Sequence, residues 1–338
     1  MPSVRAILLA AFASMLLETT ASSQEAKYAD ILDREALRQG VPTVSCPAET
    51  VDCTGSLVPK IINGRRADAG MFPWSVSVGK ANATNFRGHL CGGTLISDRF
   101  ILSAAHCFPD TARPEDYRIQ MGTVELEGYT DKISIQRILI HKHFNRATNE
   151  ADVSLLELNT PITPSASLNW IPIQDQAGFE SSGHESSEAR LQYTITGFGY
   201  IGPGKSPVRL QFSNDIPSLT TAECHELKVW DESIFGDTLK PGMICAGNTN
   251  NVYKSDACKG DSGGGLILPQ PDNTQVVVGI VSRGALPDGS LDCTQQPLRV
   301  GVYTRVSTYA SEISSCLDPG GTGCDFVAPG QQTAAVQD

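Results

Sequence analysis

A serine set among glycines is the residue of this sequence best suited to nucleophilic chemistry. Ser262 stands in the run Gly260-Asp261-Ser262-Gly263-Gly264. Glycine lets a backbone turn tightly and approach a ligand without steric cost. The hydroxyl can then be exposed, while neighbouring N–H groups point outward to stabilise a developing oxyanion. Serine alone is a poor nucleophile, however, and needs a base together with a group that orients the base.

The sequence upstream of Ser262 offers both partners. His106 ends one short apolar run, and Asp152 stands at the head of another. Each residue taken singly is more often structural, but the order His, Asp, Ser is one of the known orders of a catalytic triad. With these three motifs in this order, the sequence resembles the chymotrypsin/trypsin family of serine endopeptidases. The resemblance covers about residues 61 to 316.

The resemblance implies a role for each of these residues. Ser262 would attack a peptide carbonyl, His106 would accept and return its proton, and Asp152 would hold the imidazole tautomer. The N–H groups of Gly260 and Ser262 would form the oxyanion hole. Ser282 matches the family serine that hydrogen-bonds the triad aspartate.

Specificity is expected to rest on Asp256, six residues before Ser262. In the trypsin branch this position is the acidic floor of the primary pocket, and Gly284 and Gly301 match the glycines of its wall. A carboxylate in a poorly solvated slot needs a cation, so the resemblance implies cleavage after Arg or Lys. The alternative is that Asp256 is a solvated loop acid, which would leave room for another specificity.

Two positive side chains depart from the family pattern near this pocket. Arg283 stands where the family usually has tryptophan, so the apolar shelf for substrate residues that precede the scissile bond should be altered. Lys259 is expected at the pocket rim. Together these cations could favour acidic groups near the cleavage site.

No metal or other cofactor is expected. The loop of residues 123–131 is shorter than the calcium loop of trypsin and lacks its first glutamate. His141 and His143 would share a face of a strand, but no further ligand is evident beside them. Ordinary surface histidines are therefore the simpler interpretation.

Ten cysteines indicate disulfides. By resemblance to the family, the pairs are Cys91–Cys107, Cys224–Cys245 and Cys258–Cys293. The first would hold the turn of His106, and the third would tie the Ser262 loop to the pocket wall. Four cysteines remain, namely Cys46, Cys53, Cys316 and Cys324. Local pairing, Cys46–Cys53 and Cys316–Cys324, is favoured, whereas cross-pairing would tether the N-terminal piece to the rest of the chain; the sequence leaves both open.

The N-terminus indicates a secreted protein, and the net charge argues against one class of partner. Residues 1–23 have the pattern of a signal peptide, with Arg5 before an apolar stretch and small residues before a cut near Gln24. That stretch is too short to span a bilayer, and no later run is long enough, so no membrane anchor is expected. The net charge of −11 argues against a nucleic-acid partner, for which a basic face is typical.

A propeptide is expected over residues 24–60. The family is made as a zymogen that is cut before a segment led by Ile or Val, and Lys60 is followed here by Ile61. Cleavage after Lys60 would create an ammonium group on Ile61 that can pair with Asp261. A buried carboxylate without a partner is strongly disfavoured, so the pairing would lock the loop that carries Ser262.

The strand pattern predicts an all-β fold. Short β-rich runs alternate with turns at residues 74–78, 90–96, 100–104, 117–121 and 132–140, and again at 192–196, 209–212, 242–246, 264–268, 276–282 and 301–305. This spacing suggests antiparallel barrels. The resemblance implies two six-stranded barrels with the active site in the cleft between them. A polar stretch near residues 174–188 should form a surface loop, residues 308–316 a closing helix, and residues 317–338 a disordered tail outside the protease domain of 61–316.

The sequence thus predicts a secreted, trypsin-like serine endopeptidase whose partners are protein substrates, an activating protease and protein inhibitors. Two rival functions remain. The first is a catalytically silent homologue that acts as a binding module, although such proteins usually lack a triad residue. The second is a protease of different specificity, against which Asp256 argues.

Overall fold

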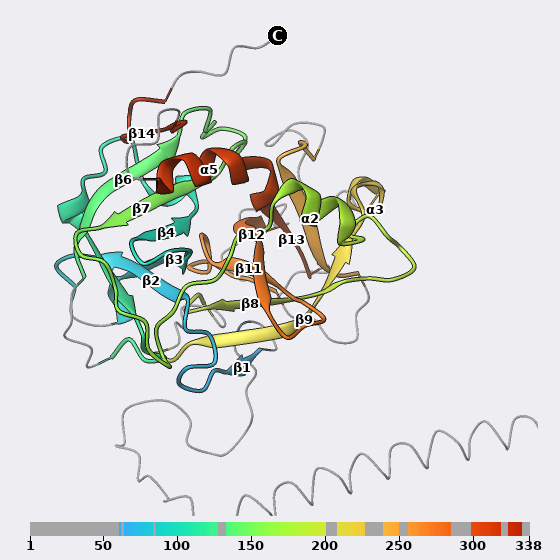
Figure 1. The fold of residues 1–338 in the computed structure, drawn as a ribbon, viewed down its shortest axis with the longest axis horizontal. Helices are drawn as coiled ribbons and strands as arrows, with labels where there is room; N and C mark the ends of the chain where they lie inside the picture. The colour runs from blue at the N-terminus through green and yellow to red at the C-terminus, as the bar shows by residue number, and fades with distance from the viewer. Residues whose placement is uncertain are drawn as a thin grey trace, which may run out of the picture. The chain divides into compact units, whose positions relative to one another are not determined.

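A computed structural model of the chain describes residues 61, 64–83, 86–127, 133–200, 208–226, 239–249, 256–284, 299–318 and 324–332 (Figure 1). All of them belong to the second of the two units into which the chain divides, Val58–Asp338. The predicted signal peptide of residues 1–23 and propeptide of residues 24–60 lie outside the described residues.

The first antiparallel sheet supplies His106 and Asp152. Its strands run in the order β14-β6-β7-β4-β3-β2-β5. They are β2 (Ser75–Lys80), β3 (His89–Leu95), β4 (Phe100–Ser103), β5 (Tyr117–Met121), β6 (Ile135–His141), β7 (Ser154–Leu158) and β14 (Phe326–Val327). The sheet curves into a half-barrel, and a bridge between Ile119 and Ile133 extends the pairing beyond β5.

The second antiparallel sheet supplies Ser262. Its order is β1-β9-β10-β13-β12-β11-β8, and the additional pairing of β9 with β8 closes six of these strands into a barrel. The strands are β1 (Arg65–Arg66), β8 (Gln192–Gly197), β9 (Gln211–Leu219), β10 (Met243–Asn248), β11 (Gly265–Pro269), β12 (Gln275–Gly284) and β13 (Arg299–Arg305).

Short helices complete the fold. The α-helices are α2 (Gln176–Ser181), α3 (Thr221–Glu226) and α5 (Ala310–Leu317), which follows a 3₁₀ turn at Val306–Tyr309. Further 3₁₀ turns lie at Phe86–Gly88, Ala105–Cys107 and Pro114–Asp116. The predicted all-β, two-barrel fold with a short C-terminal helix is confirmed, with the first barrel as a half-barrel and the second one closed.

One apolar core joins the two sheets. It combines Leu102 and Leu155 of the first sheet with Ile267 and Ile280 of the second, and Ile313 of α5 packs into the same cluster. Burial of branched apolar side chains is the dominant favourable term in folding. The shared core therefore holds the His106–Asp152 sheet and the Ser262 sheet together.

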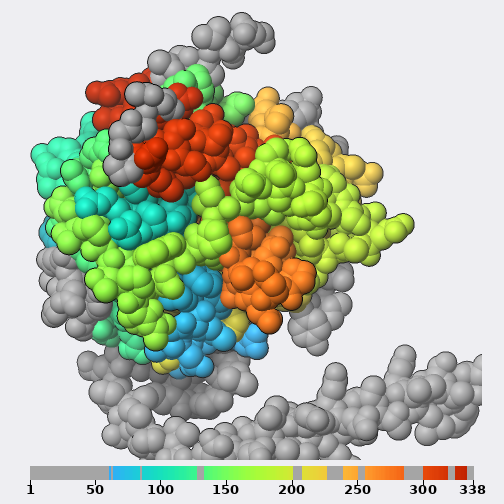
Figure 2. Space-filling view, viewed as in Figure 1, coloured from blue at the N-terminus to red at the C-terminus, as the bar shows by residue number. Residues whose placement is uncertain are grey.

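Two segments differ from the sequence prediction. The stretch of residues 174–188 is not only a surface loop, because it contains α2, and His184 within it is buried with its ring hydrogen-bonded to the hydroxyl of Tyr193. Within the predicted tail of residues 317–338, residues 324–332 carry β14, which pairs with β6. Figure 2 shows α5 and this last described segment at the surface of the molecule.

Among the described residues, no helix has both the length and the apolar character that a membrane span requires.

Candidate active site

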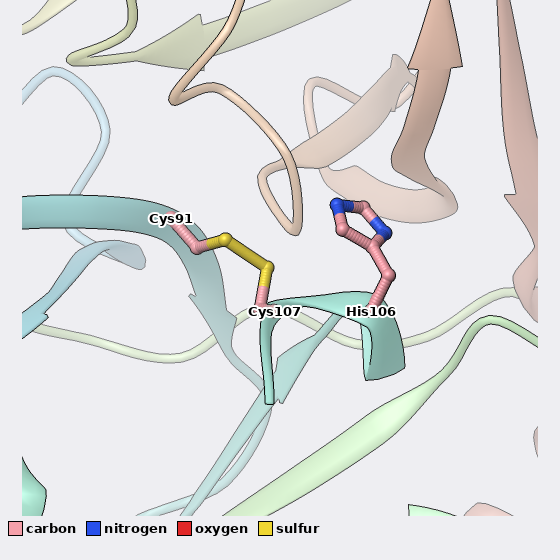
Figure 3. A group of neighbouring side chains, drawn as sticks. All are labelled: Cys91, His106 and Cys107. Carbon is pink, nitrogen blue, oxygen red and sulfur yellow. A yellow bond between two sulfur atoms is a disulfide. The ribbon is translucent and has the colours of Figure 1, made fainter. Parts of the chain in front are cut away.

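The segment after β4 presents His106. Ala105–Cys107 forms a 3₁₀ turn, and a disulfide joins Cys107 to Cys91 of β3. Figure 3 shows the imidazole of His106 beside this disulfide. Cys91, His106 and Cys107 lie close enough to hold a metal ion by distance alone, but both sulfur atoms are consumed by the disulfide and offer no thiolate ligand.

Asp152 connects the imidazole to both sheets. The side chain is completely buried. Its Oδ1 accepts the backbone N–H of His106 at 2.8 Å, and its Oδ2 lies 2.7 Å from His106 Nδ1. The hydroxyl of Ser282 donates to Oδ2 at 2.6 Å, and that of Thr304 donates to the Asp152 carbonyl at 2.9 Å. A register shift of β12 between Val281 and Arg283 places Ser282 at a bulge, a feature that re-aims side chains.

These contacts set the protonation of His106. Burial by itself would lower the pKa of the imidazole, but the charge and the hydrogen bond of Asp152 outweigh it, and the pKa is raised even though the positive charge of Arg146 opposes the shift. Because Asp152 accepts from Nδ1, the Nε2 atom of the neutral ring is free to act as a base. The arrangement of this pair is that of a base with its orienting carboxylate.

The Ser262 loop packs against the strands that lead to His106. The N–H of Gly92 in β3 donates to the Ser262 carbonyl at 2.7 Å, and Cys107 Sγ lies 3.8 Å from the same oxygen. Gly263 has a φ of 85°, and a Cβ atom there would lie 2.3 Å from Ser103 Oγ. Only glycine fits this close approach. The structure thus brings the segments of all three predicted triad residues to the junction of the two sheets.

The oxyanion donors predicted at Gly260 and Ser262 lie on this loop. In the described part of the chain, neither N–H group donates to a backbone or side-chain acceptor. The carbonyl of Gly260 is held by His89, whose Nε2 lies 2.8 Å away, and His89 Nδ1 lies 2.7 Å from Ser77 Oγ. A carbonyl only accepts, so Nε2 is the donor.

His89 and Ser77 were not anticipated from the sequence. Burial lowers the pKa of His89 to about 4, against the opposing effect of its hydrogen bond to the Gly260 carbonyl. The ring is therefore neutral at physiological pH, and with Nε2 protonated its Nδ1 accepts from the Ser77 hydroxyl. Two isolated polar residues on strands carry no motif that would have marked them as supports of the loop.

Asp261 is buried next to the nucleophile, where two backbone N–H groups bond its carboxylate. It is 2% exposed, and it accepts the N–H groups of Gly199 and Cys258, both at 2.8 Å. Burial raises the pKa of Asp261 to about 6, although these two hydrogen bonds lower it. Ile61 is equally buried and packs in the apolar cluster of the second sheet with Tyr193. Lys60 lies outside the described residues.

The predicted pocket residues lie on β12, on β13 and at the start of the Ser262 loop. Gly284 and Gly301 face each other in the β12–β13 register, and a Cβ atom on Gly284 would meet no described heavy atom within 4 Å. Asp256 is 2% exposed. Burial, and then the charges of Asp256 and Asp261, raise the pKa of Tyr303 well above its usual value, so this tyrosine lies near both carboxylates.

The side chain of Arg283 reaches the loop that precedes Asp152. Its guanidinium donates to the Thr148 carbonyl and to Met243 Sδ, the latter at 3.4 Å. Burial lowers the pKa of Arg283, and the charge of Asp152 opposes this shift. Arg283 thus ties a loop of the first sheet to a strand of the second, at the position where the family usually has an apolar shelf.

The disulfides agree with two of the pairs expected by resemblance and with the local pairing favoured for Cys316 and Cys324. Cys91–Cys107, Cys224–Cys245 and Cys316–Cys324 are formed. Cys258 is also disulfide-bonded. Its expected partner Cys293 lies outside the described residues, as do Cys46 and Cys53. The local pair Cys316–Cys324 excludes the cross-pairing that would tether the N-terminal piece.

Comparisons with known proteins agree on one family. A sequence model of the trypsin family matches residues 61–313. Mouse tryptase is 32% identical over 256 residues, which cover 74% of this chain and 85% of the tryptase. Human transmembrane protease serine 11A is 30% identical over 258 residues, which cover 76% of this chain and 55% of that protein. Mouse transmembrane protease serine 11C is 28% identical over 257 residues, which cover 76% of this chain and 53% of that protein.

The chain therefore spans about half the length of the two transmembrane proteases and most of the length of the tryptase. The family match begins at Ile61 and includes His106, Asp152 and Ser262. The chain belongs to the trypsin family of serine endopeptidases.

Proposed function

We propose that this chain is the precursor of a secreted endopeptidase that hydrolyses peptide bonds after Arg or Lys. The observation that carries the proposal is the buried Asp152, which accepts from both the backbone and the ring of His106 while Ser282 and Thr304 of the other sheet hold it in place. An aspartate with these contacts orients a histidine as a general base.

In the proposed mechanism, Ser262 Oγ attacks the carbonyl carbon of the scissile bond while His106 Nε2 takes its proton. Asp152 stabilises the imidazolium that forms, and the N–H groups of Gly260 and Ser262 donate to the carbonyl oxygen as it becomes negative. The imidazolium then protonates the leaving amine, which leaves an acyl group on Ser262. Water, activated by the same histidine, hydrolyses this ester and restores the enzyme.

Asp256 is proposed to select the substrate residue before the scissile bond. Its burial supports this role over that of a solvated loop acid, because a buried carboxylate stays charged only with a cation or strong donors nearby. The paired glycines at 284 and 301 leave room for a long side chain. Arg283 and Lys259 add positive charge around the same region, so acidic residues close to the scissile bond should be favoured further.

Activation is proposed to follow cleavage after Lys60. The freed ammonium of Ile61 would pair with Asp261, whose pKa is raised by burial in the single chain and would fall beside a positive charge. Residues 1–23 would direct secretion, residues 24–60 would be the propeptide, and a second protease would perform the cut. Proteinaceous inhibitors that fill the same cleft are the further expected partners.

Profiling of the Lys60-cleaved protein on a peptide library tests these points together. Cleavage confined to bonds after Arg and Lys, with a gain from neighbouring acidic residues, is the expected result. Cleavage after aromatic or small residues would contradict the role of Asp256. Absence of any cleavage in correctly cut protein would favour a binding module that has kept the triad without its activity.

A further inference from the structure

The segment of residues 324–332 lies beyond the family match, which ends at residue 313, yet it is firmly attached to the first sheet. The disulfide Cys316–Cys324 ties its start to α5. In β14, Phe326 pairs with His141 of β6 and is only 5% exposed. Lys142 bonds Asp325 twice, by its N–H to the carbonyl at 2.9 Å and by Nζ to the carboxylate at 2.7 Å.

After β14 the segment turns and meets the loop that follows His106. The N–H of Gln331 donates to the Ala328 carbonyl at 3.1 Å, and Gly330 within this turn has a φ of 79°. A Cβ atom on Gly330 would lie 2.8 Å from the carbonyl oxygen of Asp110. Real Cβ atoms do not approach backbone oxygen so closely, so this contact depends on glycine.

Asp110 is in turn bonded to a second loop. Arg146 donates to Asp110 Oδ1 and to the Phe108 carbonyl, both at 2.9 Å. The two loops flank the candidate active site in sequence. Residues 108–110 begin two positions after His106, and the loop closed by the Asn145–Glu150 bridge precedes Asp152. The charge of Arg146 also opposes the raised pKa of His106, which is consistent with its place near the imidazole.

We propose that residues 324–332 form a brace that holds the loops of Asp110 and Arg146 in place. The brace thereby determines how well the enzyme accepts substrate residues other than the one that enters the primary pocket. The inference rests on the peptidase activity proposed above. The exposed Asp110–Arg146 pair, with side chains 64% and 43% exposed, contributes little by itself. The packing of Gly330 on the Asp110 backbone is therefore the contact that positions the Asp110 loop. The Arg146 loop is joined to that loop through the bond of Arg146 to the Phe108 carbonyl.

A matched pair of glycine variants tests the brace. Gly330→Ala and Gly183→Ala both place alanine at a positive φ, of 79° and 76°, so both carry a similar backbone strain. Only the first adds a clash, because a Cβ atom on Gly183 meets no described heavy atom within 4 Å. Differences between the two variants thus report the contact with Asp110.

The activity assay uses the Lys60-cleaved protein, with active sites counted by a serine-directed phosphonate. Gly330→Ala should lower kcat/KM for an extended arginine peptide about tenfold, because small displacements of positioning groups are costly. It should leave a single-residue arginine ester within about twofold, since that substrate reaches only the catalytic residues and the primary pocket. Gly183→Ala should match the unmodified enzyme on both. Equal losses on both substrates, or no loss, would overturn the brace.

Hydrogen exchange of the uncut protein gives a readout that does not depend on activity. The amides of Phe108, Asp110 and residues 145–150 should exchange faster in Gly330→Ala, and at the normal rate in Gly183→Ala. A chain ending at Val327 keeps the disulfide and β14 and should behave like Gly330→Ala. Unchanged exchange in both altered proteins refutes the brace, whereas absence of phosphonate labelling in the cleaved protein refutes the proposed function instead.

Discussion

Asp152 is the residue on which the geometry of the candidate site depends most. Its carboxylate receives the backbone and ring donors of His106 and the hydroxyl of Ser282, and its carbonyl receives the hydroxyl of Thr304. Such a fully buried charge is tolerated only with donors of this kind. The orientation of the imidazole therefore depends on residues from both sheets.

Replacing this charge should alter both the rate and its pH dependence. In the cleaved enzyme, Asp152→Asn should lower kcat about 10⁴-fold, because an amide favours the wrong imidazole tautomer. The pKa of His106 should fall as well, since the charge of Asp152 raises it. A base works when deprotonated, so activity should rise at a lower pH than in the unmodified enzyme. Ser282→Ala keeps the charge, so the pH at which activity rises should stay nearly the same. A pH–rate profile in which Asp152→Asn leaves that pH unchanged would contradict the assignment.

The pocket carboxylate gives a second prediction at this scale. Asp256→Ser should reduce kcat/KM for arginine substrates on the order of 10⁴-fold, since a cationic side chain would then be buried unpaired. Labelling of Ser262 by a small uncharged phosphonate should persist, because the triad is untouched. A variant that keeps its preference for Arg over Leu in competition assays would remove Asp256 from this role.

Sequence could indicate the reactive residues but not their supports. Ser262, His106 and Asp152 lie in motifs whose order is informative by itself. His89 and Ser77, which hold the Gly260 carbonyl, are single polar residues on strands. Their function arises only when two sheets bring distant residues together, and no local pattern encodes that contact.

Among the elements, the loop from Asp256 to Gly264 is the one whose stability should change on activation. Asp261 lies in its middle, with a pKa raised by burial from 3.8 to about 6. A raised folded-state pKa means that the protonated form contributes stability, which is present below the unfolded value and lost as the pH rises through the folded value. The uncut chain should therefore lose stability between about pH 4 and pH 6.

Asp261→Asn tests this in the uncut chain, with Ser262→Ala added to prevent self-cleavage. Across that pH range, the free energy of unfolding of the protein with Asp261 should fall by about 3 kcal/mol more than that of the Asp261→Asn variant. After cleavage at Lys60, the protein with Asp261 should gain stability near neutral pH through its new ion pair, and the Asn variant should not. Urea unfolding at a series of pH values measures both effects; parallel curves for the two proteins would be inconsistent with this account.

Elements could be predicted where their pattern is local. The predicted strand at residues 100–104 corresponds to β4, and that at residues 117–121 to β5. The two-residue strand β14 was not predicted, because its conformation is fixed by the Cys316–Cys324 disulfide and by pairing with β6. A two-residue strand has no periodicity to detect.

At the scale of the whole molecule, the site depends on the apolar core shared by both sheets and α5. Ile313 of α5 is fully buried in it. Ile313→Ala should lower the free energy of unfolding by about 2–5 kcal/mol, in a single transition because the core is continuous. Ser315→Ala, on the less buried side of the same helix, should change it little. Two separate transitions in calorimetry would show that the sheets unfold independently.

The two-barrel arrangement itself was predicted only through the family resemblance. Alternating patterns indicate strands, but they do not say that β9 pairs with β8 to close one barrel while the other stays a half-barrel. Such closure depends on strand tilt and on contacts far apart in sequence. The pairing of Cys258 with Cys293 likewise remains a prediction.

Covalent labelling tests most directly whether Ser262 is an activated nucleophile. The protein cut after Lys60 should form one adduct with a serine-directed phosphonate, located at Ser262 by peptide mass analysis. The uncut protein should react far more slowly, and the cut His106→Ala variant should not react appreciably. No adduct in the cut protein, or an adduct that forms equally fast without His106, would contradict a serine endopeptidase built on this triad.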